Sequence, residues 1–429
     1  MAEKLAIVIG GGLAGSEAAF YLLKKGYAVN LYERRPEVDD GAHKTADFGE
    51  LVCSNSLKSS RLDNACGLLK EEMRKMDSLT MEAAKNSEVP GGNALSVDRN
   101  LFSKYITDKL NSFPSFHVIH EDVKELPTEA AIIATGPLTS GALLEEISKT
   151  VGDKNLSFFD ASAPIIKKES IDFSKAYYKS RFEQGDSAYI NCPFDKNEYQ
   201  KFVMELLVAT KTIVHEFDTH YFEGCLPLEV MASRGIETLR HGPLKPFGLE
   251  TPEHPRPYAV AQLRQDTKLG DYYNIVGFQT NLTYPEQKRV FSLIPGLEHA
   301  EFLSYGLMHR NSYINAPFVL NPDLSLQKAS HLFIAGQLSG VEGYVESAAL
   351  GIIAGINLDR RLTGKLPLEV PRMTVLGSLI DYLLHASGSY FSPMNANWAL
   401  MPFSRKENRE ETILTSLSLI ESYWKQVNE

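Results

Sequence analysis

Cysteine is scarce in this sequence, and its spacing excludes two common structural uses. The 429 residues include four cysteines, Cys53, Cys66, Cys192 and Cys225. So few cysteines in a chain of this length do not form a disulfide scaffold. None of them belongs to a C-x-x-C pair, so we expect no structural zinc and no other metal site. We therefore expect reduced thiols, which are available as nucleophiles.

Long hydrophobic runs are also absent. No apolar stretch approaches the ~18 residues that a membrane-spanning helix needs. The apolar stretch within residues 1–9 runs into a glycine turn rather than into a small-residue cleavage site, which is unlike a signal peptide. We expect a cytoplasmic protein that has no contact with a membrane.

Positive charge is in deficit. The chain has 44 Lys and Arg against 54 Asp and Glu, a formal net charge of −10. Taken alone, this balance favours a small substrate over a nucleic acid, because phosphate contacts require Lys and Arg. Net charge does not describe a local patch, however, so both substrate classes stay open. The length predicts two or three domains.

The first forty residues have the pattern of a β-α-β unit. The continuous apolar run 5–9 predicts a strand of a parallel sheet that is buried on both faces. A helical stretch follows as far as Lys25, and Gly26 stands where a glycine commonly ends a helix. A second strand over 27–32 ends at Glu33. This order predicts a Rossmann-like opening.

Glycines fill the turn between the first strand and the helix. Gly10, Gly12 and Gly15 form G-x-G-x-x-G, in which the glycines permit a tight turn, a close approach to a pyrophosphate and close helix–strand packing. The helix N-terminus offers free N–H groups to the phosphates. An acidic residue such as Glu33 can bind the ribose hydroxyls. The predicted dinucleotide site comprises Gly10, Gly11, Gly12, Leu13, Ala14, Gly15 and Glu33.

Two later strand ends favour FAD over NAD as the tightly bound cofactor. The predicted strand 130–135 runs into Gly136, and the predicted strand 331–335 runs into Gly336 and Gln337. Glycines at strand ends bring the backbone against an extended flavin nucleotide. We therefore add Gly136, Gly336 and Gln337 to the predicted cofactor site.

The composition and the pattern of predicted elements change near residue 155, and the earlier pattern resumes near residue 325. The intervening part is rich in aromatic residues and proline and mixes strand-like with helical patterns. We predict an α/β fold with a Rossmann-like FAD-binding domain and an inserted α+β domain. The predicted parts are 1–155 (FAD-binding, first part), 156–324 (inserted, on the RNA and nicotinamide side) and 325–429 (FAD-binding, second part, with C-terminal helices).

Several sequence blocks carry a family resemblance. GGGLAGSE at 10–17, ELVCSNSL at 50–57 and AGQLSGVEGYVES at 335–347 resemble the folate- and FAD-dependent tRNA (uracil-5-)-methyltransferases. Further similar blocks are LLKEEMR at 68–74, FEGCLPLEVMA at 222–232, QLRQD at 262–266, NIVGFQT at 274–280 and YGLMHR at 305–310. The similarity extends to about residue 403. Differences at Lys44, Asn93 and His241 leave open a paralogue that acts on ribosomal RNA.

The resemblance implies a reaction and its cosubstrates. The expected enzyme is a flavoprotein that methylates C5 of a uridine in the T-loop of tRNA. Methylenetetrahydrofolate would supply the carbon, reduced FAD the hydride, and NADH or NADPH would reduce the flavin again. The alternatives are the same chemistry on a ribosomal RNA uridine, or a small-molecule FAD-dependent oxidoreductase. No stable protein partner is predicted.

The resemblance also assigns roles to particular residues. Cys53 resembles the family's flavin-side cysteine, and Cys225 its second active-site cysteine. One thiolate would add to uracil C6, which activates C5 toward the one-carbon unit. Tyr344 is a candidate to lie against the flavin ring. Cys66 and Cys192 match no family position, and we expect them to be structural.

Overall fold

The structure is a computed structural model of the chain. It describes residues 4–39, 42–139, 141–152, 155–158, 161–183, 189–212, 226–266, 270–308, 312–386, 391–402 and 408–429. Of the predicted site residues, Cys225 lies outside the described residues.

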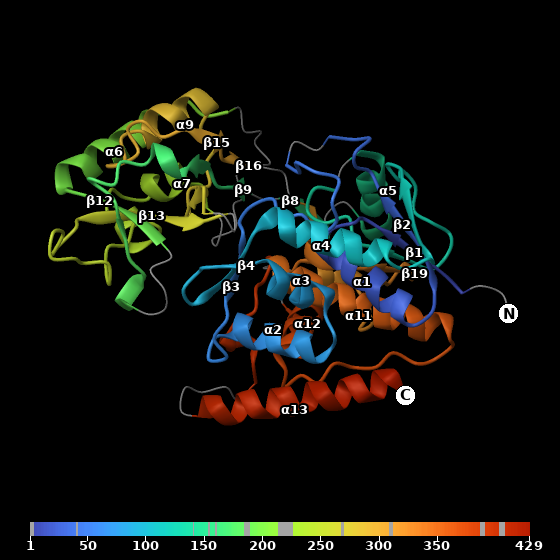
Figure 1. Ribbon diagram of the computed structural model, residues 1–429. Helices are drawn as coiled ribbons and strands as arrows, with labels where there is room; N and C mark the ends of the chain where they lie inside the picture. Colours follow the sequence, from blue (N-terminus) through green and yellow to red (C-terminus); the bar gives the residue numbers. More distant parts are fainter. Residues whose placement is uncertain are drawn as a thin grey trace.

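A six-stranded, mainly parallel sheet forms the larger part of the molecule (Figure 1). The helix α1 (Leu13–Lys24) connects the neighbouring parallel strands β1 (Leu5–Ile9) and β2 (Ala28–Glu33), as the opening of the sequence predicts. Only β18 at one edge runs antiparallel to its neighbour. The strand order is β18 (Ser325–Leu326), β19 (Ala329–Ile334), β7 (Ala131–Ile133), β1 (Leu5–Ile9), β2 (Ala28–Glu33) and β6 (Phe116–His120). The predicted α/β fold with a parallel sheet is confirmed.

Two helices, α1 and α11 (Tyr344–Leu362), pack closely together beside the glycine turn of residues 10–15. The helix α11 follows β19 and lies against α1 (Figure 1). A Cβ atom on Gly351 would stand only 2.1 Å from the carbonyl oxygen of Ala14. Small residues therefore let the two backbones approach, and the start of α11 is held beside the start of α1.

One predicted irregular region contains a strand. The sequence of residues 42–64, which is polar and interrupted by glycine and asparagine, predicts a loop or irregular segment, but β3 (Ser56–Ser59) pairs with β5 (Ala94–Val97), which also pairs with β4 (Glu88–Val89). The expectation was wrong here because the partner strand is nearly forty residues away, and a short polar segment alone does not reveal it. Around this sheet lie α2 (Ala65–Lys75), α3 (Leu79–Ser87) and α4 (Arg99–Asn111).

A second, antiparallel six-stranded sheet lies in the part of the chain between the strands β7 and β19. It has its own hydrophobic cluster and stands to one side of the parallel sheet (Figure 1). Its strand order is β11 (Tyr177–Tyr178), β12 (Tyr189–Phe194), β13 (Ala259–Gln265), β14 (Tyr272–Ile275), β10 (Ile165–Lys167) and β15 (Phe302–Ser304). Its helices are α6 (Lys196–Val208), α7 (Leu228–Ser233), α8 (Thr238–His241) and α9 (Tyr284–Phe291).

Two short ladders stand where the chain passes between the two sheets. They pair β8 (Leu156–Phe158) with β17 (Ser312–Ile314), and β9 (Ala161–Ser162) with β16 (Leu307–Met308). Helices α5 (Gly141–Val151) and α10 (Ala316–Val319) flank this crossing in sequence. The predicted boundaries near 155 and 325 stay predictions, although both fall close to these ladders.

The C-terminal helices pack on α2. The helix α13 (Arg409–Asn428) runs below α2 in Figure 1, and α12 (Val375–His385) contacts both α2 and α10. The buried carboxylate of Glu72 accepts hydrogen bonds from the backbone amides of Val375 (2.7 Å) and Leu376 (2.9 Å), and from the Ser416 hydroxyl. Glu72 therefore joins three helices. Among the described helices, none is long and apolar enough to cross a membrane.

Candidate functional site

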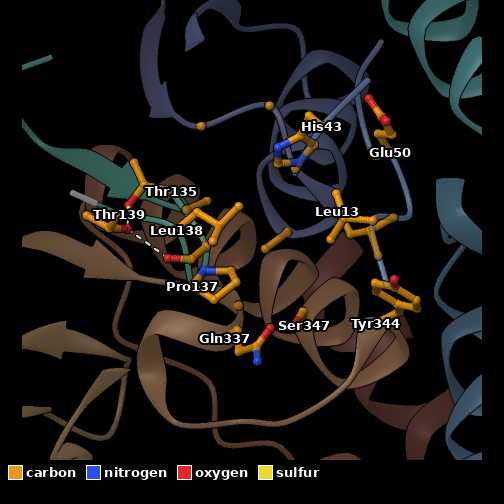
Figure 2. Close-up of a pocket in the computed structure, with 18 of the residues that line it drawn as sticks. Leu13, His43, Glu50, Thr135, Pro137, Leu138, Thr139, Gln337, Tyr344 and Ser347 are labelled. Carbon is orange, nitrogen blue, oxygen red and sulfur yellow. Dashed lines mark hydrogen bonds between the residues drawn. The ribbon is translucent and has the colours of Figure 1, made fainter. Parts of the chain in front are cut away.

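A cavity of about 370 Å³ runs along the carboxyl ends of the parallel strands. Ligands of open α/β sheets bind at this edge. The glycine turn after β1 forms part of its wall, and the segment that carries Cys53 forms another part. Figure 2 shows Leu13, Thr135, Gln337 and Tyr344 around it. The cavity therefore joins the predicted cofactor site to one predicted catalytic cysteine.

The glycine turn has the shape of a phosphate cradle. A Cβ atom on Gly10 would lie 2.5 Å from the carbonyl oxygen of Ala134, and one on Gly15 would lie 1.8 Å from the carbonyl oxygen of Gly10. At Gly12, by contrast, a Cβ atom would meet nothing within 4 Å. Gly12 is also the N-cap of α1, and no side chain caps that helix end. Open space in front of uncapped amides fits a pyrophosphate.

Glu33 has a structural partner in addition to its place on the cavity wall. Its carboxylate accepts hydrogen bonds from the Gly11 amide at 2.8 Å and from Arg35 Nε at 2.9 Å. Burial alone would raise the pKa of Glu33, but the hydrogen bonds and charge of Arg35 outweigh it and hold the pKa below its usual range. The ionised carboxylate therefore fixes the glycine turn, and a ribose contact stays a prediction.

The two later strand ends also line the cavity. Gly136 follows β7 with φ +67°, and Gly336 follows β19 with φ +74°. A Cβ atom on Gly336 would stand 2.9 Å from Ala14 Cβ. The next residue, Gln337, donates a 2.7 Å hydrogen bond from Nε2 to Glu342 Oε2. Both positions need glycine because of their positive φ, which accounts for the pattern in the sequence.

Tyr344 holds the segment that carries Cys53. The Tyr344 hydroxyl oxygen accepts hydrogen bonds from the backbone amides of Cys53 (2.7 Å) and Ser54 (3.1 Å). Burial raises the pKa of the phenol, so it stays protonated at neutral pH. Both Tyr344 and Cys53 line the cavity. The first turn of α11 therefore positions the predicted nucleophile, a relation that the sequence did not reveal.

Two arginines surround the same segment, and sequence reasoning assigned a role to neither. Arg99 Nη1 donates to the carbonyl oxygens of Leu51 (3.0 Å) and Val52 (3.4 Å), while its Nε donates to Asp266 Oδ1 at 2.9 Å. Arg264 donates from Nε to Asn55 Oδ1 at 3.0 Å and from Nη2 to the Ser54 hydroxyl. The block at 262–266 was the available signal, because it contains Arg264 and Asp266.

The other two described cysteines lie away from the cavity wall. Cys66 and Cys192 are both buried, and burial raises the pKa of each thiol. Lys70 Nζ lies 3.4 Å from Cys66 Sγ. Neither residue lines the cavity. They fit the structural role that we predicted for them, and Cys53 is the described cysteine that reaches the cavity.

The cavity fits FAD. The glycine turn would hold the pyrophosphate, Gly136, Gly336 and Gln337 would lie along the nucleotide, and Tyr344 is placed on the wall beside Cys53. FAD supplies hydride-transfer chemistry when it is bound. In the part of the chain that the structure describes, no cluster of His, Cys, Asp or Glu is arranged to hold a metal ion.

Comparison with known proteins gives the relatives of this chain. The family model described as "GIDA: Glucose inhibited division protein A" matches residues 6–366. A methylenetetrahydrofolate–tRNA-(uracil-5-)-methyltransferase TrmFO from Lactobacillus delbrueckii subsp. bulgaricus is 53% identical over 94% of this chain and 92% of its own length. A protein of the same description from Staphylococcus carnosus is 50% identical over 99% of each chain.

Among solved structures, Aquifex aeolicus GidA in its form II crystal has the same fold. It matches with a TM-score of 0.71 at 17% identity, over 98% of this chain and 74% of that one. The predicted family is thus confirmed by near-full-length relatives at about half identity, and the predicted α/β fold by the structural match. The chain belongs to the family of methylenetetrahydrofolate–tRNA-(uracil-5-)-methyltransferases.

Proposed function

We propose that this protein methylates C5 of a uridine in the T-loop of tRNA, with methylenetetrahydrofolate as carbon donor and FAD as its tightly bound cofactor. The observation that carries the proposal is that Cys53 and the glycine turn line the same cavity. A thiol beside a flavin site suits the reaction, because uracil needs a nucleophile at C6 and the transferred carbon needs a hydride. The relatives described as tRNA (uracil-5-)-methyltransferases support the choice of substrate.

The reaction divides into steps that balance. A thiolate forms a bond to uracil C6, and C5 then bonds to the methylene carbon as one of its two carbon–nitrogen bonds to the folate breaks. The C5 proton leaves to a base, the second carbon–nitrogen bond breaks and releases tetrahydrofolate, and a hydride converts the exocyclic methylene to a methyl group. Elimination of the thiolate restores the C5=C6 bond. FAD supplies the hydride when it has been reduced, and we propose NADH or NADPH as the reductant.

We propose the two cysteines of the family pattern as the reacting thiols. Cys53 reaches the cavity, and Tyr344, Arg99 and Arg264 hold its segment from three other parts of the chain. Cys225 is the slightly preferred nucleophile at C6, and Cys53 would then assist proton transfer or hold an intermediate. We further propose that residues 156–324 form the side that receives RNA and nicotinamide, and that the enzyme acts in the cytoplasm.

The decisive experiment follows a labelled one-carbon unit. Purified protein with FAD, NADH or NADPH, and methylenetetrahydrofolate labelled in its methylene carbon should transfer label to unmodified tRNA. Nucleoside mass spectrometry should identify 5-methyluridine. In cells that lack the gene, the tRNA T-loop should lose that nucleoside. Label in ribosomal RNA alone, or NADH oxidation by a small acceptor without RNA, would instead support one of the two alternatives.

A further inference from the structure

Arg264 crosses from the antiparallel sheet to the segment that carries Cys53. It lies on β13, yet its side chain donates to Asn55 Oδ1 at 3.0 Å, to the Ser54 hydroxyl, and to Asn274 Oδ1 at 3.2 Å. It is 9% exposed, and it lines the cavity together with Cys53. A cation is therefore fixed on the wall beside the segment that carries Cys53.

This guanidinium has no carboxylate partner among the described residues. Asp266, two residues further along the chain, accepts instead from Arg99 Nε (2.9 Å) and from Asn274 Nδ2 (3.2 Å). All three hydrogen-bond acceptors of Arg264 are neutral oxygens, and burial lowers its pKa. The charge of Asp266 acts on Arg264 without a direct ion pair, and burial outweighs it. A buried charge that makes no direct ion pair is costly unless a ligand compensates it.

The contacts of Arg264 also leave part of its hydrogen-bonding capacity unused. Nε and Nη2 make the contacts to the protein, and within the described ranges Nη1 makes no hydrogen bond. A guanidinium presents five N–H donors in a planar fork. Because one edge of the fork is fixed by Ser54 and Asn55, the other donors stay available to an oxygen in the cavity.

We propose that Arg264 binds the C4 oxygen of the target uracil and stabilises the negative charge that forms there. The inference rests on the proposed function. When the thiolate bonds to C6, the electron pair of the C5=C6 bond moves into the ring and its charge gathers on the C4 oxygen as an enolate. The pair returns when C5 bonds to the methylene carbon. A fixed cation at that oxygen stabilises the transition state more than the neutral base.

The position of Arg264 favours the enolate oxygen of the base over the FAD phosphates as the anion that Arg264 binds. The FAD phosphates belong at the glycine cradle, where Gly12 faces open space. Arg264 is instead bonded to Ser54 and Asn55, the two residues that follow Cys53. The anion that Arg264 is placed to meet is therefore one that forms on a base held beside Cys53, whichever of the two predicted cysteines attacks C6. Arg264 would also distinguish uracil from cytosine, which carries an amino group at C4.

The test is a thermodynamic cycle that combines a change of the Arg264 side chain with a change of the C4 oxygen of the substrate. Methyl transfer is measured for wild type and Arg264→Gln with tRNA that carries either uridine or 4-thiouridine at the target, since sulfur is a weaker acceptor than oxygen. Wild type should prefer uridine by about tenfold, and Arg264→Gln should lose that preference, because coupled groups show non-additive effects. With uridine, the Arg264→Gln rate should fall ~100-fold, as when an oxyanion donor is removed.

Binding measurements and a second variant keep the result interpretable. Arg264→Gln should retain FAD and its RNA affinity, while Arg264→Lys should recover part of the rate. Arg361→Gln, at the distant end of α11, is the control and should behave as wild type. Equal preference for uridine in wild type and Arg264→Gln would overturn the inference, as would loss of FAD in both Arg264 variants. If wild-type protein transfers no carbon to RNA at all, the proposed function itself fails.

Discussion

The hydroxyl oxygen of Tyr344 accepts a 2.7 Å hydrogen bond from the backbone amide of Cys53, which lies 291 residues away in the sequence. The same oxygen accepts from Ser54 at 3.1 Å. A partly buried tyrosine thus fixes the backbone of Cys53. This relation makes the start of α11 part of the reaction site as well as part of the cofactor site, and it can be tested directly.

Replacement of Tyr344 by Phe should loosen the Cys53 segment without removing the aromatic ring from the cavity wall. Two amides would lose their acceptor, at a cost of about 1–3 kcal/mol in stability for a buried unsatisfied group. We expect FAD to stay bound and methyl transfer to fall about tenfold. Stopped-flow measurement of flavin reduction by NADPH distinguishes a defect at the flavin from a defect in methyl transfer. Unchanged methyl transfer would show that the segment needs no support from Tyr344.

The phosphate cradle predicts that Gly12→Val abolishes FAD binding while the fold persists. Gly12 has φ −72° and ψ −171°, a conformation that any residue adopts, and its Cβ would meet no protein atom within 4 Å. The valine side chain would therefore occupy only the space of the ligand. The purified variant should be colourless, with a circular dichroism spectrum like that of wild type. A yellow Gly12→Val protein with one FAD per chain would contradict the cradle.

The cysteine assignment predicts two inactive variants and one active control. Cys53→Ala and Cys225→Ala should each abolish transfer of the labelled carbon and retain FAD absorbance. Cys192→Ala should keep its activity and lose about 1 kcal/mol of stability, because Cys192 is fully buried in the antiparallel sheet. Near-normal transfer by either Cys53→Ala or Cys225→Ala would rule out a reaction that requires both thiols.

Glu72 predicts a pH dependence of stability in the C-terminal packing. Burial raises its pKa to about 7 in the folded protein, although hydrogen bonds from Ser416, Leu376 and Val375 oppose the shift. In the unfolded chain the group ionises near its ordinary value of about 4.3. Between these values the folded state binds more protons at Glu72, so the contribution of Glu72 to stability is highest below about pH 4 and declines until about pH 7.

The matched experiment compares Glu72→Gln with wild type at several pH values. The wild type should lose up to about 3 kcal/mol more than the variant between pH 4.5 and 7.5, because one pKa unit corresponds to about 1.4 kcal/mol. Denaturant unfolding at each pH measures this difference. Two parallel stability curves would show that Glu72 does not titrate between those limits.

The ion pair of Asp266 with Arg99 predicts that Asp266→Asn strongly lowers the stability of the protein. Its carboxylate is the ion-pair partner of buried Arg99, which in turn holds the carbonyl oxygens of Leu51 and Val52. Asp266→Asn would leave that buried guanidinium without a counter-charge, at a cost of about 3–5 kcal/mol. A fall in melting temperature together with lost methyl transfer is expected. The double variant Asp266→Asn with Arg99→Met should recover part of the stability, and no recovery would contradict the ion-pair account.

Local pattern alone determined the nucleotide-binding part of this protein. The apolar run before Gly10, the glycine spacing to Gly15, and Glu33 at the end of the second strand predicted β1, α1 and β2 at nearly their observed bounds. Such prediction works because strand, turn and helix each depend on neighbouring residues, and each glycine reports a backbone conformation or a close contact. The same kind of local identity in the cysteine blocks carried the family resemblance.

Tertiary structure decided what surrounds Cys53. Arg99, Arg264 and Tyr344 come from α4, β13 and α11, and their sequence separations from Cys53 carry no periodic signal. Their meeting depends on how the antiparallel sheet packs against the parallel one, and on the small residues that let α11 approach α1. The strand β3 was missed for the same reason, since its partner β5 is distant in sequence. A sequence specifies such contacts only through the whole fold, because the free energy that fixes them is shared among many packed residues.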